Sequence, residues 1–322
     1  MFALDYFLGV YSPILLAIVM LSTTIYVLSL LTIARYHVLR HKPFFMLIMA
    51  LGCMDLGSMW FSFLFQRLLS NRVIASFYLS FGNHGVLPFM CTNAVMLFHS
   101  AQKFLLVAIA LNRFSSMLPG PHGIQMWTRT LCRFYIFVII GTHVVMGVAF
   151  ETVGRSFFDL ADDKSNILQC RRENYGLQNS ATLYSTFLSI AAAAVSCALY
   201  IASAFRFIRN RNIVKSIARR DQAIRKTEQE LTICAFVQSL FLILHGASSV
   251  VAFAVPIPTF IYINDCTQDL LSLTNAYVLP LFSPQLSNRI RYIINESRKI
   301  IMKERSENEG HSVAYTSASS LR

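Results

Sequence analysis

Apolar residues occur in seven long runs along the chain, and charged residues are almost confined to the segments between them. Four intervals contain no charged residue, namely those between Asp5 and Arg35, Arg72 and Lys103, Glu173 and Arg206, and Glu230 and Asp265. Each interval is at or above the roughly 20 residues that a helix needs to cross about 30 Å of hydrocarbon. The pattern predicts seven membrane-spanning helices, at about residues 9–34, 43–66, 88–113, 134–151, 181–206, 230–255 and 262–284.

Helices rather than strands are expected, because a helix satisfies all its backbone hydrogen bonds within the lipid and these runs lack the alternation of barrel strands. The fold class is therefore an all-α membrane protein with a seven-helix transmembrane bundle over residues 1–304. Within that domain, apolar residues at helical spacing among basic ones predict a juxtamembrane helix at about 285–302. The polar, Ser-rich segment 305–322 is expected to be a disordered cytoplasmic tail.

Composition agrees with a membrane protein, since 55% of the 322 residues are hydrophobic and only 14% are charged. A soluble domain carries about 25% charged residues. The net charge of +12 is unevenly distributed. Of the 28 Lys and Arg, 21 lie in the loops after spans one, three and five and in the tail, six lie in the opposite loops, and Lys103 lies within span three.

This asymmetry predicts the orientation. The basic loops are expected in the cytoplasm, with the N-terminus outside and the C-terminus cytoplasmic. The positive charge is then a matter of topology, and it suits lipid headgroups and an acidic protein partner rather than nucleic acid. The expected location is a membrane that the chain crosses several times.

Seven cysteines are present, and two of them are expected outside the cytoplasm near each other. Cys91 lies near the outer end of span three and Cys170 lies in the second outer loop. An oxidising compartment makes a Cys91–Cys170 disulfide the favoured pairing. A Cys170–Cys266 bridge is the main alternative.

Two charged residues fall inside predicted spans. Asp55 and Lys103 lie at similar depth on adjacent spans, and an unpaired charge there costs roughly 2.5–3.5 kcal/mol or more. We predict that the two form an ion pair, with Gln102 or Asn275 as further partners. The alternative is a protonated Asp55 and a Lys103 that snorkels toward the membrane surface.

Three segments carry a resemblance to a known family. The first is Leu111-Asn112-Arg113-Phe114, followed by Pro119, Pro121 and Trp127; the second is Glu228 with Glu230-Leu231-Thr232; the third runs from Asp269 through Ser283-Pro284-Gln285-Leu286 to Arg289. In order and spacing they resemble a nematode serpentine chemoreceptor of the Srg superfamily, most closely class V (Srv), within the architecture of G-protein-coupled receptors. The resemblance covers the chain to about residue 300.

The resemblance implies a function. Such a receptor binds a small external molecule, an odorant or pheromone, and activates a heterotrimeric G protein at the plasma membrane of a sensory neuron or its cilium. It implies no enzymatic activity, no cofactor and no metal. The sequence makes no prediction of the oligomeric state.

Candidate coupling residues follow from the same resemblance. Arg113 matches the Arg of the Asp/Glu-Arg-Tyr motif of rhodopsin-like receptors, but Asn112 replaces the acidic residue. Arg113 is interpreted as a G-protein or switch contact, and the alternative is a positively charged anchor at a helix end. Span seven has Tyr277 followed by Pro280 instead of the order Asn-Pro-x-x-Tyr, so Pro280 is expected to kink this helix.

The ligand is expected in the outer half of the bundle, where polar side chains interrupt an aromatic and apolar interior. The candidate contacts are His99, Asn93, Tyr184, His245, Tyr262 and Asp269. Asp269 is the best of them for a cationic ligand. For each residue alone, a role in helix packing is the alternative.

Other classes of protein are less well supported. His37 and His41 have the spacing of metal ligands on a helix, but no second histidine cluster accompanies them, and no phosphate-binding loop or hydrolase motif is present. A seven-span ligand-gated channel of opposite orientation conflicts with the charge asymmetry. A transporter is the other alternative, although internal repeats are not evident.

Overall fold

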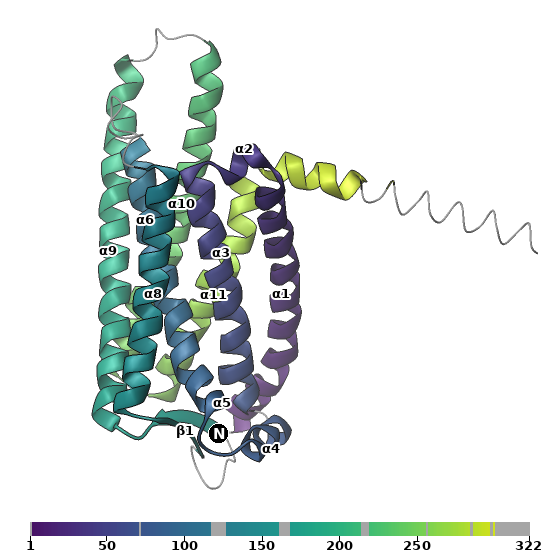
Figure 1. The fold of residues 1–322 in the computed structure, drawn as a ribbon, viewed down its shortest axis with the longest axis vertical. Helices are drawn as coiled ribbons and strands as arrows, with labels where there is room; N and C mark the ends of the chain where they lie inside the picture. Colours follow the sequence, from purple (N-terminus) through teal and green to yellow (C-terminus); the bar gives the residue numbers. More distant parts are fainter. Residues whose placement is uncertain are drawn as a thin grey trace, which may run out of the picture.

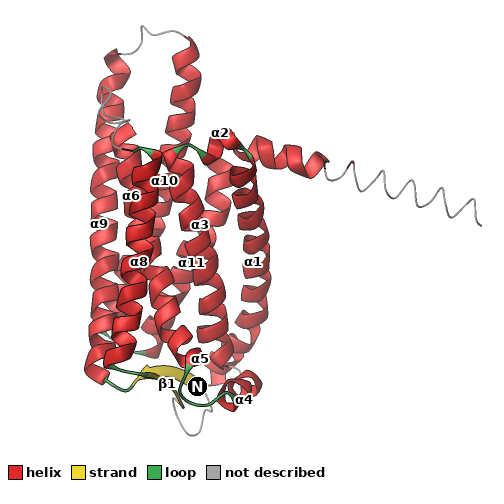
Figure 2. Ribbon diagram, in the orientation of Figure 1, coloured by secondary structure: helices red, strands yellow, loops and turns green. Residues whose placement is uncertain are grey.

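The computed structural model describes residues 2–70, 72–116, 127–160, 168–213, 219–255, 257–283, 286–296 and 299. These residues form a bundle of long helices that run up and down, closed at one end by a β-hairpin (Figures 1 and 2). The long helices are α1 (Phe2–Arg35), α3 (Pro43–Ser62), α6 (Val95–Ser116), α8 (Arg129–Val153), α9 (Tyr175–Ile213), α10 (Arg219–Ala254) and α11 (Pro258–Phe282).

Six stretches of the described residues are long and apolar enough to cross a membrane. They are Pro13–Arg35, Pro43–Phe65, Val86–Ser116, Arg129–Val153, Asn179–Arg206 and Thr232–Ala254. They correspond to the first six predicted spans, and the fourth is longer than predicted. The predicted seventh span corresponds to α11, a helix of 25 residues that packs against α10, α3 and α1. α11 contains Asp265 and Asp269, which lower its apolarity.

Short elements connect the long helices at the two ends of the bundle. One end carries α2 (His37–Arg40) and is called the α2 end. The other, the hairpin end, carries the π turn η1 (Phe63–Arg67), the 3-10 turn η2 (Leu68–Ser70), α4 (Arg72–Ser80), α5 (Val86–Phe89) and the π turn η3 (Met90–Ala94), with strands β1 (Ser156–Leu160) and β2 (Leu168–Arg172). The start of α1 lies at the hairpin end, and the helical segment 286–296 lies at the α2 end (Figure 1).

The β-hairpin was not predicted from the sequence. Its antiparallel strands place Phe158 opposite Cys170, and Phe158 and Leu168 are buried. Both side chains pack in a cluster with Tyr78 of α4 and Cys91 of η3, and the Phe158 amide donates to the carbonyl of Asn83 at 2.9 Å. The hairpin is therefore packed onto the helix ends as a cap.

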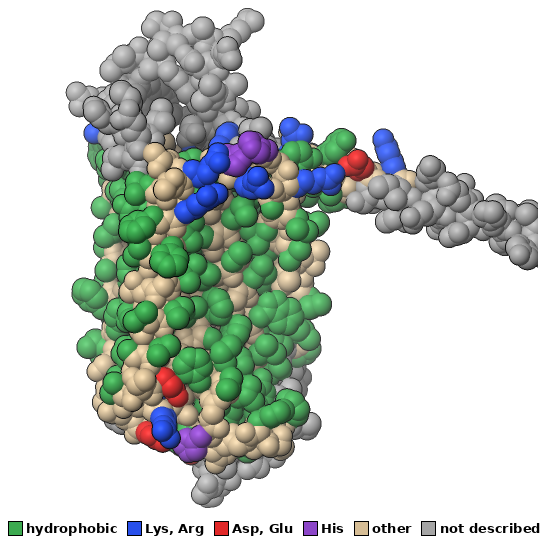
Figure 3. All heavy atoms as spheres, in the orientation of Figure 1, with side chains coloured by type: hydrophobic (Ala, Val, Ile, Leu, Met, Phe, Trp, Pro, Cys, Tyr) green, Lys and Arg blue, Asp and Glu red, His purple; other side chains and the backbone are tan. Residues whose placement is uncertain are grey.

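The interior of the bundle contains both apolar and polar side chains, and its outer face is apolar. α8 exposes Phe137 (75%) along with Phe134 and Val145 on its outer face, and apolar side chains cover the middle of the molecule (Figure 3). Lys, Arg and His gather at the α2 end in the same view. An apolar surface this extensive requires a non-aqueous surrounding.

Helix α6 lies at the centre of the bundle, in contact with α3, α8, α9 and α10. Its approach to α3 is close at Gly57, where an added Cβ would lie 2.4 Å from the ring of Phe98. The absence of a side chain at Gly57 thus allows an aromatic ring to fill the α3–α6 interface.

At the α2 end, α11 continues through Pro280 and ends at Phe282. Residues 286–296 are helical, within the predicted juxtamembrane helix, and the predicted tail at 305–322 lies outside the described residues.

Candidate functional site

The centre of the bundle contains a hydrogen-bond network around Asp55 of α3. Asp55 is fully buried (0% exposed). Its carboxylate accepts hydrogen bonds from the Tyr26 hydroxyl of α1, from Gln102 Nε2 of α6 at 2.6 Å and from Asn275 Nδ2 of α11 at 2.9 Å. One carboxylate therefore joins four helices.

Neutral side chains extend this network toward the hairpin end. Gln102 Nε2 also lies 3.2 Å from Ser272 Oγ, which is hydrogen-bonded to Ser58 at 3.0 Å. Gln268 Nε2 donates to the side-chain oxygen Oε1 of Gln102 at 2.8 Å. Since residues 268, 272 and 275 recur at helical spacing, one face of α11 supplies the polar groups that meet α3 and α6.

The predicted Asp55–Lys103 ion pair is wrong in this structure. Lys103 Nζ lies 3.3 Å from Ser185 Oγ and 3.5 Å from the Ser185 carbonyl oxygen, on α9. The reason is geometric, because consecutive residues of a helix point about 100° apart. Gln102 faces α3 and reaches Asp55, so Lys103 faces α9. The two predicted helpers of the pair, Gln102 and Asn275, are the residues that hold Asp55.

Two of the predicted ligand contacts lie together with Lys103. His245 of α10 is buried, and its Nδ1 lies 3.3 Å from Thr267 Oγ1 of α11. Lys103 and His99 lie close enough to His245 to act on it electrostatically. His99 is one helical turn before Lys103 on α6, so three basic groups converge in the interior.

The other predicted ligand contacts are dispersed. Asn93 belongs to the hairpin network described next. Tyr184 is half-buried on α9, beside Ser185 in sequence. Asp269 is buried and accepts a hydrogen bond from Ser62 Oγ of α3 at 3.2 Å. The side chain of Tyr262 lies outside the described residues.

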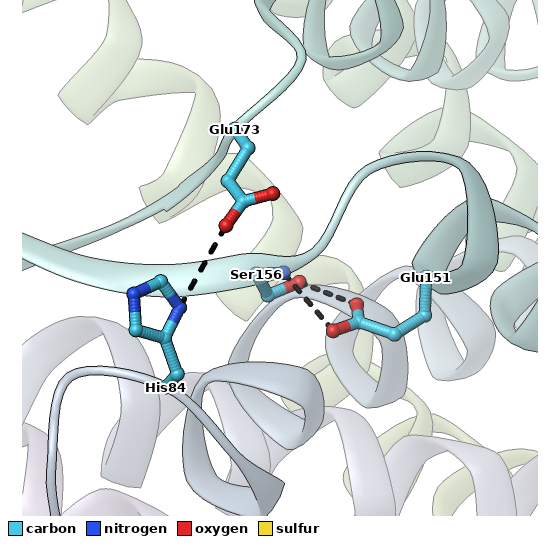
Figure 4. A network of polar contacts seen from close by, with 4 residues as sticks. All are labelled: His84, Glu151, Ser156 and Glu173. Carbon is cyan, nitrogen blue, oxygen red and sulfur yellow. Dashed lines mark hydrogen bonds and ion pairs between the residues drawn. The ribbon is translucent and has the colours of Figure 1, made fainter.

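At the hairpin end, polar contacts fasten β1 and β2 to the helices. Glu151 of α8 accepts hydrogen bonds from the Ser156 amide at 3.0 Å and from the Ser156 hydroxyl at 2.7 Å (Figure 4). His84 Nδ1 lies 3.9 Å from Glu173 in the same region.

Arg172 and Asn93 continue this hairpin network into the bundle. The Arg172 guanidinium donates to Asn93 Oδ1 at 2.7 Å, and Asn93 Nδ2 donates to Glu151 at 2.9 Å. Burial lowers the pKa of Arg172, and the neighbouring Glu151 carboxylate opposes that shift. Asn93 therefore links the hairpin to the segment just before α6, and it does not join Lys103, His99 and His245.

Cys91 and Cys170 are brought together by the hairpin. The Cys91 thiol lies 3.3 Å from the Phe65 carbonyl oxygen and the Cys170 thiol lies 3.4 Å from the Pro88 carbonyl oxygen. The two side chains are close enough to interact with each other. Both are thiols in this structure, so the predicted disulfide stays a prediction.

Arg113 lies near the α2 end of α6 and points into the bundle. It is 5% exposed. Its guanidinium donates to Asn112 Oδ1 at 2.8 Å, and its Cζ lies 4.2 Å from the ring centroid of Phe44 in α3. It also acts electrostatically on Tyr200 of α9 and Cys234 of α10. A basic residue that served as an interfacial anchor would instead extend to the surface.

The remaining coupling candidates lie on α11. The Tyr277 hydroxyl is hydrogen-bonded to Ser22 Oγ of α1 at 2.9 Å. Pro280 lies inside the last turn of the helix. Tyr277 thus joins α11 to α1, and the contacts do not place it beside Arg113.

Sequence reasoning missed several members of these networks. Ser58, Ser185 and Ser272 are common residues in membrane helices, and Tyr26 is one of 13 tyrosines. The spacing of Gln268, Ser272 and Asn275 was a usable signal, because it marks one polar face of an otherwise apolar helix.

An apolar exterior, six helices among the described residues that are long and apolar enough to cross a membrane, and interior polar networks define a multi-pass membrane protein. Comparison with known families identifies the class of membrane protein to which the chain belongs. Residues 13–290 match the family model described as Srg family chemoreceptor. The chain therefore belongs to the Srg family of chemoreceptors, which points to a receptor rather than an enzyme. A search of curated proteins found no match.

Proposed function

We propose that the chain is a seven-span, G-protein-coupled chemosensory receptor with its hairpin end outside the cell and its α2 end in the cytoplasm. α11 serves as the seventh span. At 25 residues it is about 37 Å long, and its polar groups are turned toward α3, α6 and α10. An odd number of crossings agrees with the opposite positions of the start of α1 and of segment 286–296 (Figure 1).

The burial of Arg113 carries the proposal. This guanidinium lies among α3, α6, α9 and α10, at the end where the basic residues gather. A permanently charged group in such a position favours any rearrangement that presents it to a negative partner. The carboxyl end of a G-protein helix, with its negative dipole, has the chemistry to be that partner when the helices separate at the α2 end.

The ligand in this proposal is a small external molecule that enters the hairpin half of the bundle. The Asp55 network joins α1, α3, α6 and α11 at the centre of the bundle and extends toward that half, so it supplies polar contacts whose arrangement a bound ligand shifts. By resemblance, we assign the receptor to class V of the superfamily, in the plasma membrane of nematode sensory neurons.

We also propose that Cys91 and Cys170 form a disulfide in the mature receptor. Their side chains are adjacent and the hairpin end faces an oxidising compartment. Peptide mapping under non-reducing conditions should recover the two cysteines in one linked peptide pair. Recovery of Cys170 linked to Cys266, or of both as alkylated thiols, would contradict the pairing.

G-protein release tests the proposed function. The receptor is expressed with heterotrimeric G proteins of each class, and subunit dissociation is followed by resonance energy transfer during a screen of volatile and water-soluble metabolites. At least one compound should cause dissociation in cells with the receptor and none in cells without it. The Arg113→Gln variant should lose this response at equal surface expression.

Arg129 supplies a matched control for Arg113. It is an exposed arginine at the start of α8, at the same end of the bundle. The Arg129→Gln variant removes the same charge from the rim and should keep the response. Equal loss in both variants would mean that the α2 end needs only its total positive charge, and the proposed role of Arg113 would be wrong.

A further inference from the structure

Lys103 lies inside the bundle among neutral groups. Its side chain is 1% exposed. Its hydrogen-bond partners among the described residues are the hydroxyl and carbonyl oxygens of Ser185, at 3.3 and 3.5 Å. No described carboxylate forms an ion pair with it. A neutral environment is unfavourable for an ammonium group at membrane depth, so Lys103 marks a place that a negative charge would stabilise.

Two histidines make the same place more basic. His99 lies one turn before Lys103 on α6, and His245 approaches both from α10. The described hydrogen-bond partner of the His245 ring is the Thr267 hydroxyl at 3.3 Å. Three side chains that can carry positive charge therefore face one region, which we name the basic site (His99, Lys103 and His245).

The basic site lies in the half of the bundle nearer the hairpin. Ser185 is ten residues after the start of α9, about 15 Å along the helix, and His245 is nine residues before the end of α10, about 14 Å. α6 begins at the hairpin end, and side chains lean toward the start of their helix, so Lys103 leans the same way. The basic site therefore faces the end of the bundle from which an external ligand is proposed to enter.

The buried carboxylates of the bundle interact with other partners. Asp55 accepts hydrogen bonds from Tyr26, Gln102 and Asn275. Asp269 accepts one from Ser62 on α3. The interior thus has its acidic groups toward α1, α3 and α11 and its basic groups between α6, α9 and α10.

We propose that the ligand of this receptor carries a carboxylate, and that Lys103 binds it with help from His99 and His245. The inference rests on the proposed function and names its ligand class. It also reverses the expectation from the sequence that Asp269 would select a cationic ligand. The rest of the ligand is expected to be mainly apolar, because α6 and α10 carry mostly apolar side chains around these polar groups.

The effect of a negative charge in the basic site can be measured in the absence of any ligand, by comparing the stability of two variants at Ser185. Ser185→Asp places a carboxylate beside Lys103, and Ser185→Asn places an uncharged side chain of the same shape there. Purified in detergent, the Asp variant should unfold at a higher temperature than the Asn variant, by several degrees. Adding Lys103→Met to the Asp variant should abolish the difference. An Asp variant no more stable than the Asn variant, or a gain that persists without Lys103, would overturn the proposal.

A chain-matched set of compounds tests the ligand class. Decanoic acid, decan-1-ol and decylamine are added to the purified receptor, and thermal unfolding is followed in each case. Decanoic acid should protect the receptor more than the alcohol or the amine. Lys103→Met should lower the apparent affinity for decanoic acid, taken from the concentration that gives half of the protection, about ten- to hundredfold, as expected for loss of a charge-assisted contact. Lys103→Arg should retain most of that affinity. Ser185→Asp should block it.

Equal protection by the three compounds, or protection by the acid that is absent or independent of Lys103, would overturn the proposal. None of these measurements involves a G protein. A receptor that binds acids through Lys103 but releases no G protein would contradict the proposed function and leave the ligand class standing. A receptor that couples to a G protein but prefers amines would support the proposed function and contradict the ligand class.

Discussion

Removing the Asp55 side chain is the perturbation for which the structure gives the clearest expected magnitude. In the Asp55→Ala variant, the Tyr26 hydroxyl, Gln102 Nε2 and Asn275 Nδ2 lose their common acceptor. All three groups are buried, so water cannot replace the carboxylate readily. The variant should therefore be much less stable than the wild type.

The size of the effect follows from the number of lost hydrogen bonds. Interhelical hydrogen bonds in membrane proteins contribute about 0.6 kcal/mol on average and up to about 1.7 kcal/mol. Three bonds to one carboxylate then give about 2–5 kcal/mol, with the upper part favoured because the acceptor can be charged. Ser58→Ala is the matched control, since it removes one neutral bond, to Ser272 at 3.0 Å, from the same helix. It should cost about 0.6 kcal/mol.

The assay is reversible unfolding of the purified receptor in mixed micelles with increasing dodecyl sulfate, followed by helical circular dichroism. If Asp55→Ala and Ser58→Ala differ by less than about 1 kcal/mol, Asp55 does not organise the network and the reasoning is refuted. A double-mutant cycle with Asp55→Asn and Lys103→Met adds a second check. Since the two side chains contact different helices, their effects should add to within about 0.5 kcal/mol, whereas a coupling of 1 kcal/mol or more would restore the predicted ion pair.

Two further predictions concern packing and the hairpin. Gly57→Ala should destabilise the fold by about 1–3 kcal/mol because the new methyl group overlaps the Phe98 ring. Gly141→Ala is the control: nothing lies within 4 Å of its added Cβ, so it should gain about 0.5–1 kcal/mol from the higher helix propensity of Ala. Equal effects of the two substitutions in the same unfolding assay would contradict the close α3–α6 approach. Arg172→Met should cost about 1.5–3 kcal/mol and make the hairpin more accessible to protease, because it removes the 2.7 Å bond to Asn93. Arg171→Met breaks a half-exposed ion pair with Asp159 at 3.1 Å and should cost under about 1 kcal/mol. Similar cleavage of the two variants would show that Arg172 does not fasten the hairpin.

Much of the helical architecture follows from the sequence, because the length of an apolar run and the charges that flank it are local properties. The first six predicted spans correspond to helices of membrane-spanning length. The hairpin strands and α4 could not be derived in the same way. Their pairing depends on contacts with distant segments, such as that of the Phe158 amide with the Asn83 carbonyl.

The rotation of each helix was the main property that the sequence left open. Counting residues gave the depth of Asp55 and Lys103 but not the direction of either side chain around its helix axis. A rotation of about 100° separates Gln102 from Lys103, and it decides which of them reaches Asp55. The same uncertainty explains why Asn93 was grouped with His99, although the structure places Asn93 with Arg172.

The topology of the chain in the membrane tests the central claim most directly. One epitope tag is placed at Met1 and another after Arg322, and antibody binding is compared in intact and permeabilised cells. The seven-span receptor predicts that intact cells bind only the antibody to the tag at Met1 and that permeabilised cells bind both. Binding to the tag after Arg322 on intact cells, or no binding at Met1 until the cells are permeabilised, would contradict the span count or the orientation, and with it the assignment of the α2 end to the G protein.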